Sequence, residues 1–443
     1  MADGASNLEL DVLIRDMGQR ARTAATALAE TTAAQRSAGL TAMAESLRAA
    51  EGGILAANGR DVERARANGL SEALIDRLAL TPARVAAMAE AVGEVAAFPD
   101  PLGVETARWT RPNGLDIARV RTPLGVLAII YESRPNVTAD AAALCLRSGN
   151  VALLRCGSDC LESSRAIHAA MVAGLAKAGL PVDAVQLVPT RDRAAVGLLL
   201  GGLEGTIDLV VPRGGKSLVA RVQAEARVPT LSHLEGLNHT YLHAAADPDM
   251  AREIVVNAKL RRVSVCGATE TLLVDAASAE RLLPPVAEAL IAGGCELRGD
   301  ESARDLVPAM VAAGEDDWST EYLAPVLSVR IVDGMEAAIA HIRRYGSGHT
   351  EAIVTEDAEA ATRFLNAVDS AIVVWNASTQ FADGGEFGFG GEIGISTGRL
   401  HARGPVGAEQ LTSYKYVVRG AGQTRPWTRP PQAALAAVFF SLS

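Results

Sequence analysis

Apolar residues recur at three- and four-residue spacing from residue 7 to about residue 97, as at Leu40, Met43 and Leu47. This period gathers apolar side chains on one face of a helix, so it predicts a run of amphipathic helices. At Thr81-Pro82 the threonine hydroxyl can cap unpaired N–H groups, and proline suits the first helical turn. We therefore expect a helix to begin there.

Beyond the turn-rich residues 98–103, short apolar runs alternate with helical patterns. The alternation predicts parallel, doubly wound sheets, and its recurrence after residue 266 predicts two α/β domains. The expected strands are residues 115–120, 126–131, 151–155, 185–189, 207–211, 271–274 and 326–331. One expected helix ends near residue 179, and another follows residue 189. A third begins at Lys216, and two more span residues 279–292 and 336–344.

The length and composition fit an enzyme with two or three domains. At 443 residues the chain exceeds a single compact core. Its formal net charge of -10, with no long basic run, excludes nucleic acid as an expected partner. The apolar run 124–131 is far shorter than the roughly 20 residues of a membrane helix. The N-terminus lacks a secretory pattern, so we expect a cytoplasmic protein without a membrane span.

Five cysteines stand at positions 145, 156, 160, 266 and 295, without a CxxC pair or a histidine ladder. This spacing predicts neither disulfides nor a metal site, although Cys156 and Cys160 can share one face of a turn. Cys266 follows Arg261-Arg262 in a loop, where cations and N–H groups can lower the thiol pKa and create a nucleophile. The alternative is a buried, inert cysteine.

Two turns after strands carry further candidate chemistry. Asn136 begins the helix that follows strand 126–131, and its amide can donate to an oxyanion or cap the helix. Residues 212–217 lead from a strand into a helix, with Arg213 and Lys216 beside Gly214-Gly215. Glycine N–H groups at a helix start can bind an anion, although an ordinary turn explains the pattern equally well.

A glycine-rich stretch and a carboxylate complete the local candidates. Residues 381–407 hold nine glycines together with Arg399, His401 and Arg403, which favours a phosphate-bearing ligand over a merely flexible loop. Glu321 stands just before strand 326–331. On its own, Glu321 is equally consistent with a surface acid or a helix cap.

Five runs of residues, in this order, carry a resemblance to a known family. They are YESRPNVTADAA, VPRGGKSLV, STEYLAPVLSV, HTEAIVTED and EFGFGGEIGISTGRLHARGPVGAEQLTSYKYVV. From about residue 8 to about residue 425 the chain resembles the aldehyde dehydrogenase superfamily and, within it, the gamma-glutamyl phosphate reductase family. The resemblance implies an NADPH-dependent reduction of L-glutamyl 5-phosphate to L-glutamate 5-semialdehyde and phosphate, through a cysteine thioacyl intermediate, in proline biosynthesis.

The same resemblance assigns roles to residues. It implies Cys266 as nucleophile, Asn136 as the oxyanion asparagine and Glu321 as the acid that contacts the nicotinamide ribose. Around these, the cofactor residues are expected to be Arg155, Pro212, Arg213, Gly214 and Gly215. Candidate substrate residues are the cations Lys259, Arg262, Arg399, His401 and Arg403.

Two segments depart from the family pattern. The chain reads NAKLRRVSVCGA where the family usually reads NAKTQRPGVCNA, so the neighbours of Cys266 differ. Ser158 stands where the family has a lysine that can meet a cofactor phosphate. NADH therefore stays open beside NADPH.

The resemblance also implies a domain plan. Residues 1–256 would form a helical N-terminus and a cofactor domain, of which residues 111–125 contribute to a flap. Residues 257–395 would form a catalytic domain, and residues 396–443 a return segment. The flap combines residues 115–121 with 411–418, and its edge strands favour a homodimer or homotetramer. The apolar tail after Pro426 would pack on a neighbouring subunit or stay mobile.

Other functions stay open at this point. One is a reductase of the same fold acting on another acyl phosphate, a thioester or an aldehyde. Another is a catalytically weakened scaffold that binds a partner such as glutamate 5-kinase, because the residues beside Cys266 are unusual.

Overall fold

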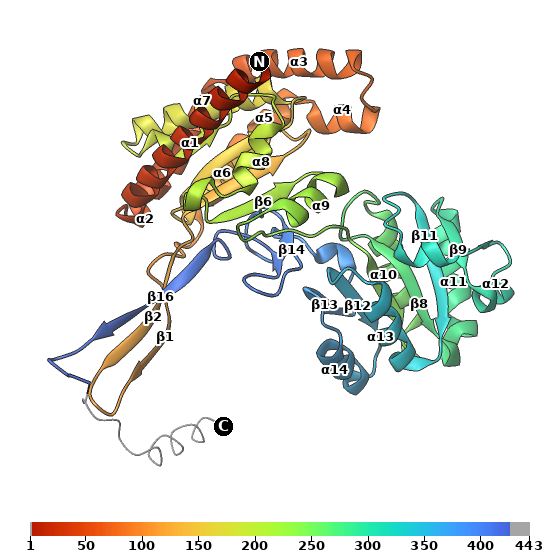
Figure 1. Cartoon of the computed structure of the whole chain (residues 1–443). Coiled ribbons are helices and arrows are strands. Elements are labelled where there is room, and N and C mark those ends of the chain that lie inside the picture. The colour runs from red at the N-terminus through yellow and green to blue at the C-terminus, as the bar shows by residue number, and fades with distance from the viewer. Residues whose placement is uncertain (1, 426–443) are drawn as a thin grey trace.

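The computed structural model describes residues 2–425 and opens with five helices (Figure 1). Thr81 accepts a hydrogen bond from the Arg84 N–H at 3.2 Å, so the predicted helix start is confirmed. Thr32 and Gln35 form a capping box at the second helix. The five are α1 (Ala2–Ala29), α2 (Ala33–Ala49), α3 (Glu51–Ala67), α4 (Glu72–Leu78) and α5 (Pro82–Ala97).

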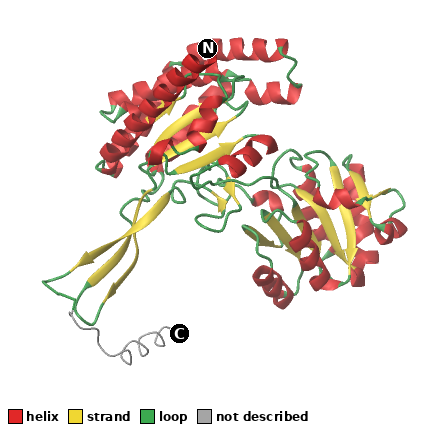
Figure 2. Ribbon diagram, viewed as in Figure 1, coloured by secondary structure: helices red, strands yellow, loops and turns green. Residues whose placement is uncertain are grey.

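The first sheet has four parallel strands in the order β5-β4-β3-β6, with helices packed around it (Figure 2). Its two central strands are buried along their whole length, as expected for a sheet covered on both faces. The strands are β3 (Val126–Tyr131), β4 (Val151–Cys156), β5 (Val185–Leu187) and β6 (Leu209–Arg213). The helices are α6 (Val137–Arg147), α7 (Leu161–Lys177), α8 (Ala194–Leu200) and α9 (Lys216–Glu225).

The second sheet has seven parallel strands in the order β10-β9-β11-β8-β7-β12-β13. The prediction of two α/β units, each built on a parallel sheet, is thus confirmed. The strands are β7 (Asn238–Leu242), β8 (Thr269–Asp275), β9 (Glu296–Gly299), β10 (Val311–Ala312), β11 (Val326–Val332), β12 (Thr350–Val354) and β13 (Ile372–Trp375). The helices are α10 (Pro248–Leu260), α11 (Ala279–Ala292), α12 (Glu301–Leu306), α13 (Gly334–Tyr345) and α14 (Ala358–Ala367).

The expected boundary between residues 256 and 257 needs correction. Strand β7 pairs with β8 and β12, so the second sheet already includes residues 238–242. Helix α10, which packs on α11 and β8, also starts before that boundary. The sequence pattern hid β7 because its buried positions include the polar residues Asn238, His239 and Thr240.

A three-stranded antiparallel flap projects away from both sheets (Figure 1). Strand β2 (Asp116–Pro123) lies between β1 (Glu105–Thr110) and β16 (Thr412–Arg419), and it pairs Arg119 with Tyr416. The predicted pairing of residues 115–121 with 411–418 is therefore confirmed. Strand β1 was not expected, because its mostly exposed residues show no apolar alternation.

The remaining short strands, β14 (Ile395–Ser396) and β15 (Gly404–Pro405), pair with each other between the sheets and the flap. Across residues 2–425, no helix has both the length and the apolar character needed to cross a bilayer. The tail after Pro426, for which we expected a subunit contact or mobility, lies outside the described residues.

Candidate active site

Cys266 lies in the loop between α10 and β8, and it is half-buried, whereas the chain's other four cysteines are buried. The Asn238 side-chain amide donates to the Cys266 carbonyl at 2.6 Å and to the Ala268 carbonyl at 2.9 Å. Gly236 packs against the same backbone, and a Cβ there would lie 2.0 Å from the Cys266 carbonyl oxygen. The segment before β7 therefore holds the cysteine loop in place.

Charged side chains from several elements surround the Cys266 thiol. Burial raises the pKa of this thiol to about 11; the Arg213 guanidinium opposes the shift, while Glu392 and Glu321 add to it. Burial also lowers the pKa of Arg134 to about 10, and the nearby Arg213 lowers it further. At neutral pH the thiol is thus protonated, next to a pair of guanidinium groups suited to an anionic ligand.

Two histidines lie next to the thiol. One ring nitrogen each from His233 and His349 and the Cys266 sulfur all lie within 4.8 Å of one another. The His233 Nδ1 is 2.9 Å from the Ile395 carbonyl, and the His349 Nδ1 is 2.8 Å from the Thr350 hydroxyl. Burial lowers the pKa of His233, and it lowers that of His349 to about 3. Both rings are therefore neutral at pH 7.

Sequence reasoning did not identify these histidines. They stand 33 residues before and 83 residues after Cys266, so no local spacing joins them to it. His349 does lie within the HTEAIVTED run that carries the family resemblance, which is a usable signal. For His233, Gly236 and Asn238 the sequence offers no comparable signal.

Glu321 and Lys259, both expected at the site, have different surroundings. Glu321 accepts a hydrogen bond from the Gly236 N–H at 2.9 Å, and burial raises its pKa. Lys259 is completely buried and lies 2.5 Å from Glu270. Burial raises the pKa of Glu270 to about 7, against the influence of Lys259. The Lys259 ammonium is therefore engaged by a protein carboxylate, and the role of Lys259 toward substrate stays a prediction.

Asn136 stands at the start of α6, where its side chain makes no capping hydrogen bond within the described part of the chain. Instead its amide nitrogen donates to the Asp140 carboxylate at 2.8 Å. Burial raises the pKa of Asp140 to about 6, while the Asn136 hydrogen bond and the Arg213 charge lower it. The helix-cap alternative is wrong, and the second amide hydrogen remains for an oxyanion.

The carboxyl ends of β3, β4 and β6 meet at one edge of the first sheet, as in nucleotide-binding α/β folds. Glu132 accepts a hydrogen bond from the Gly215 N–H at 3.2 Å, and a Cβ on Gly214 would lie 2.5 Å from the same carboxylate. No described side chain caps α9, and within 4 Å of a Cβ on Gly215 the described chain leaves open space. One N–H of this helix start is thus engaged by the Glu132 carboxylate, and a cofactor pyrophosphate would have to use the open space beside Gly215.

Two arginines lie beside that edge. The buried Arg155 directs its Nη2 toward the carbonyls of Arg191 and Asp192, each at 3.4 Å. Arg191 itself donates to the Ser158 carbonyl at 3.2 Å. The Arg191 guanidinium thus stands next to the serine that replaces the family lysine, and it also pairs with the Glu162 carboxylate at 3.1 Å. Arg191 was not among the predicted residues.

The glycine-rich stretch approaches Arg213 near its middle, at Gly394. A Cβ on Gly394 would lie 3.3 Å from the Arg213 Nη1. Further along, Arg399 and Arg403 both pair with Asp369, and the His401 Nε2 lies 2.7 Å from the Gln410 carbonyl. All three side chains are thus engaged by other groups of the protein.

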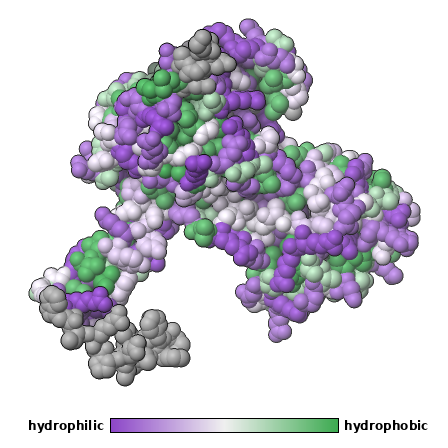
Figure 3. Space-filling model, viewed as in Figure 1, coloured by the Kyte–Doolittle hydropathy of each residue, from purple (hydrophilic) through white to green (hydrophobic). Residues whose placement is uncertain are grey.

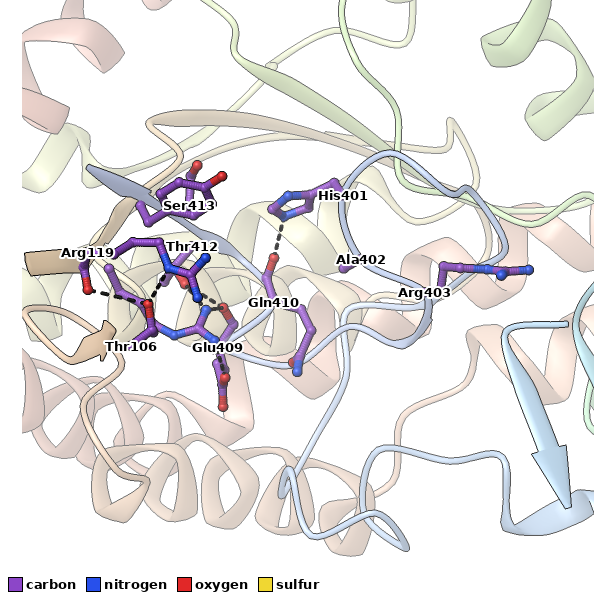
Figure 4. A pocket seen from close by; sticks show the side chains of 11 residues that line it. Thr106, Arg119, His401, Ala402, Arg403, Glu409, Gln410, Thr412 and Ser413 are labelled. Carbon is purple, nitrogen blue, oxygen red and sulfur yellow. Dashed lines mark hydrogen bonds and ion pairs between the residues drawn. The ribbon is translucent and has the colours of Figure 1, made fainter. Parts of the chain in front are cut away.

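His401 and Arg403 line a cavity of about 350 Å³ at the base of the flap (Figure 4). Arg119 and Arg121 of β2 line it as well, whereas Cys266 does not. Arg262 is exposed on the cysteine loop, close enough to lower the pKa of Arg134. Of the predicted substrate cations, Arg262 is thus near the thiol, and the role of the others stays a prediction.

The chain is similar along most of its length to known proteins. The chain matches the aldehyde dehydrogenase family model over residues 12–293 and 290–417. It is 68% identical over 419 residues to the gamma-glutamyl phosphate reductase of Caulobacter sp. strain K31, covering 95% of this chain and 100% of that one. For the enzyme of that name from Caulobacter vibrioides strain ATCC 19089 / CIP 103742 / CB 15, identity is 67% over 410 residues, covering 93% and 99%. The crystal structure of the Thermotoga maritima gamma-glutamyl phosphate reductase superposes with a TM-score of 0.91 at 43% identity, covering 93% and 100%.

Proposed function

The chain belongs to the aldehyde dehydrogenase family and, within it, to the gamma-glutamyl phosphate reductases, and from this premise we propose how it acts. It reduces L-glutamyl 5-phosphate to L-glutamate 5-semialdehyde and phosphate, with NADPH as reductant and Cys266 as nucleophile. The observation that supports this most is a half-buried thiol beside Arg134 and Arg213, because an acyl phosphate brings both an electrophilic carbon and an anion.

The first step joins the Cys266 sulfur to the acyl carbon as the carbon–oxygen bond to phosphate breaks. The neutral imidazole of His233 accepts the thiol proton, which a thiol with a pKa of about 11 would otherwise retain at pH 7. Arg134 and Arg213 stabilise the departing phosphate. The product of this step is a thioester on Cys266.

The cofactor supplies, when bound, the hydride that reduces this thioester. The α9 start with Pro212 to Gly215 would hold its pyrophosphate, and Glu321 its nicotinamide ribose. Asn136 and the Cys266 N–H donate to the oxyanion on the acyl carbon. Breaking the carbon–sulfur bond then releases the aldehyde and restores the thiol. The pathway requires no base for water, and the half-buried position of Cys266 limits hydrolysis.

NADPH is proposed over NADH on the strength of Arg191. Its guanidinium lies at the Ser158 carbonyl, where it can pair with the 2′-phosphate that NADH lacks. The change Arg191→Ala is expected to raise KM for NADPH about tenfold or more and to leave KM for NADH nearly unchanged. Arg60→Ala, an exposed arginine on α3, is the control. An equal effect on both cofactors would contradict this assignment.

The wider setting is also proposed. We place the reaction in the cytoplasm, downstream of a glutamate 5-kinase, and expect a homodimer or homotetramer assembled through the flap. With the boundary moved before β7, the cofactor domain precedes residue 238 and the catalytic domain follows it.

The decisive experiment runs the reaction backwards, with glutamate semialdehyde, phosphate and NADP. Reduction of NADP is expected to require phosphate and to be lost in Cys266→Ala, whereas Cys295→Ala, which alters a buried cysteine, keeps it. Activity without phosphate, or with coenzyme A in its place, would point to another acyl substrate. Activity that survives Cys266→Ala would refute the nucleophile.

A further inference from the structure

Beyond the proposed function, we propose that Cys266, His233 and His349 form a reversible binding site for Zn²⁺, which inhibits the enzyme by occupying its nucleophile. The three ligand atoms lie within 4.8 Å of one another. They come from three separate places: the segment before β7, the loop before β8 and the residue that immediately precedes β12. The site is not a resident cofactor site, because the proposed reaction needs the Cys266 sulfur free.

The ring nitrogens are arranged as metal ligands require. In both histidines the Nδ1 atom already has an oxygen partner, which leaves Nε2 to bind. His349 is completely buried, and its Nε2 has no hydrogen-bond partner among residues 2–425. A buried polar atom without a partner is costly, so an occupant that binds this nitrogen is favoured. Oxygen partners on the far ring nitrogen also resemble the outer shell that orients zinc-bound histidines.

The donor types select the metal. One sulfur and two imidazole nitrogens suit Zn²⁺, whereas Mg²⁺ and Ca²⁺ prefer oxygen ligands. Around a tetrahedral zinc with bonds of about 2.0–2.3 Å, the ligand atoms would be about 3.3–3.6 Å apart. The three ligand atoms, which lie within 4.8 Å of one another, therefore have to approach by at most about 1.5 Å, which rotations of the half-buried Cys266 and His233 side chains can provide. Three protein ligands leave the fourth position for water.

Zinc binding to Cys266 involves no change of oxidation state. The Cys266 S–H bond breaks, its proton passes to solvent, and a sulfur–zinc bond forms. The bound sulfur can no longer attack an acyl phosphate. A chelator reverses the inhibition by removing the ion.

The test uses the full chain without substrate or cofactor, so that its outcome does not depend on the proposed reaction. Co²⁺ is titrated into metal-free protein, and the thiolate-to-cobalt charge-transfer absorption is followed, with Zn²⁺ added as a competitor. We expect one Co²⁺ per chain, displacement by Zn²⁺, and loss of the charge-transfer band in Cys266→Ala. His233→Ala and His349→Gln are each expected to weaken binding at least tenfold.

The matched control is His168→Gln on α7, because glutamine can keep the hydrogen bond to the Val185 carbonyl. It should bind Co²⁺ as the parent protein does. The proposal is overturned if the parent protein shows no charge-transfer band, if the band survives Cys266→Ala, or if both histidine variants bind normally. If the His349→Gln variant does not fold, the Co²⁺ affinity of His233→Ala alone decides the test, because His233 is only half-buried.

Discussion

At the scale of single residues, the reactivity of Cys266 is set by opposing influences on one thiol. Burial raises its pKa to about 11, and the Arg213 charge lowers it. In the ligand-free protein, alkylation of Cys266 by iodoacetamide is therefore expected to speed up about tenfold per pH unit between pH 7 and 10. Intact-protein mass spectrometry measures the rate.

Arg213→Gln gives the matched comparison. Because it removes the charge that stabilises the thiolate, the pKa of Cys266 should rise and alkylation at pH 8 should slow. Arg165→Gln, on the exposed face of α7, should leave the rate unchanged. A rate that is flat across this pH range would contradict the raised pKa.

Gly236 sets the position of the cysteine loop by leaving room for it. A Cβ there would lie 2.0 Å from the Cys266 carbonyl oxygen, so Gly236→Ala must displace the loop. We expect kcat to fall at least tenfold, measured in the reductive direction. Gly59→Ala is the matched control, since its Cβ would meet no described atom within 4 Å and alanine is the better residue in helix α3. Its melting temperature should stay the same or rise, with full activity.

Single residues also show what a sequence can and cannot predict. Cys266, Arg213 and Glu321 could be found because motifs and the family resemblance point to them. Gly236 and His233 could not, because they reach the thiol only through the pairing of β7 with β8 and β12. Contacts between segments far apart in the chain leave no local pattern.

At the scale of elements, helix starts are where local sequence acts most directly. Thr81 caps α5, so Thr81→Ala should lower the free energy of unfolding by about 1 kcal/mol. Ser71 precedes α4 in the equivalent position but makes no side-chain cap bond within the described residues, so Ser71→Ala should change it much less. Urea unfolding measures both, and equal losses would show that the Thr81 bond contributes nothing.

Elements were predictable where burial follows the local pattern. Strand β3 spans Val126–Tyr131, as expected, because all six of its residues are buried and apolar. Strand β7 was missed because several of its buried residues are polar: the Nδ1 of the buried His239, for example, lies 2.9 Å from a Glu351 carboxylate oxygen. Strand β1 was missed for the opposite reason, since it is mostly exposed.

At the scale of the whole molecule, no helix among residues 2–425 covers either face of the flap sheet (Figure 1). Tyr414, Tyr416 and Val418 are each more than half exposed on β16, and apolar residues gather on the flap surface (Figure 3). Edge strands and exposed aromatic rings favour pairing with a second copy.

Tyr416→Asp should therefore dissociate the oligomer. Sedimentation velocity is expected to show a shift toward monomer, because a carboxylate would be buried without a partner. Ile291→Asp, which alters an exposed apolar residue on α11, should leave the assembly intact. An unchanged oligomer in the Tyr416 variant would place the interface elsewhere.

The pairing of β2 with β16 joins residues 116–123 to residues 412–419, and this separation has a consequence for biosynthesis. During translation, both α/β layers emerge from the ribosome before β16 does. The flap stays two-stranded until then, so a nascent chain cannot present the finished three-stranded sheet to a neighbour on the same messenger. The assembly that we propose to form through the flap is thereby delayed until the segments that carry Cys266 and the other proposed site residues have all been synthesised.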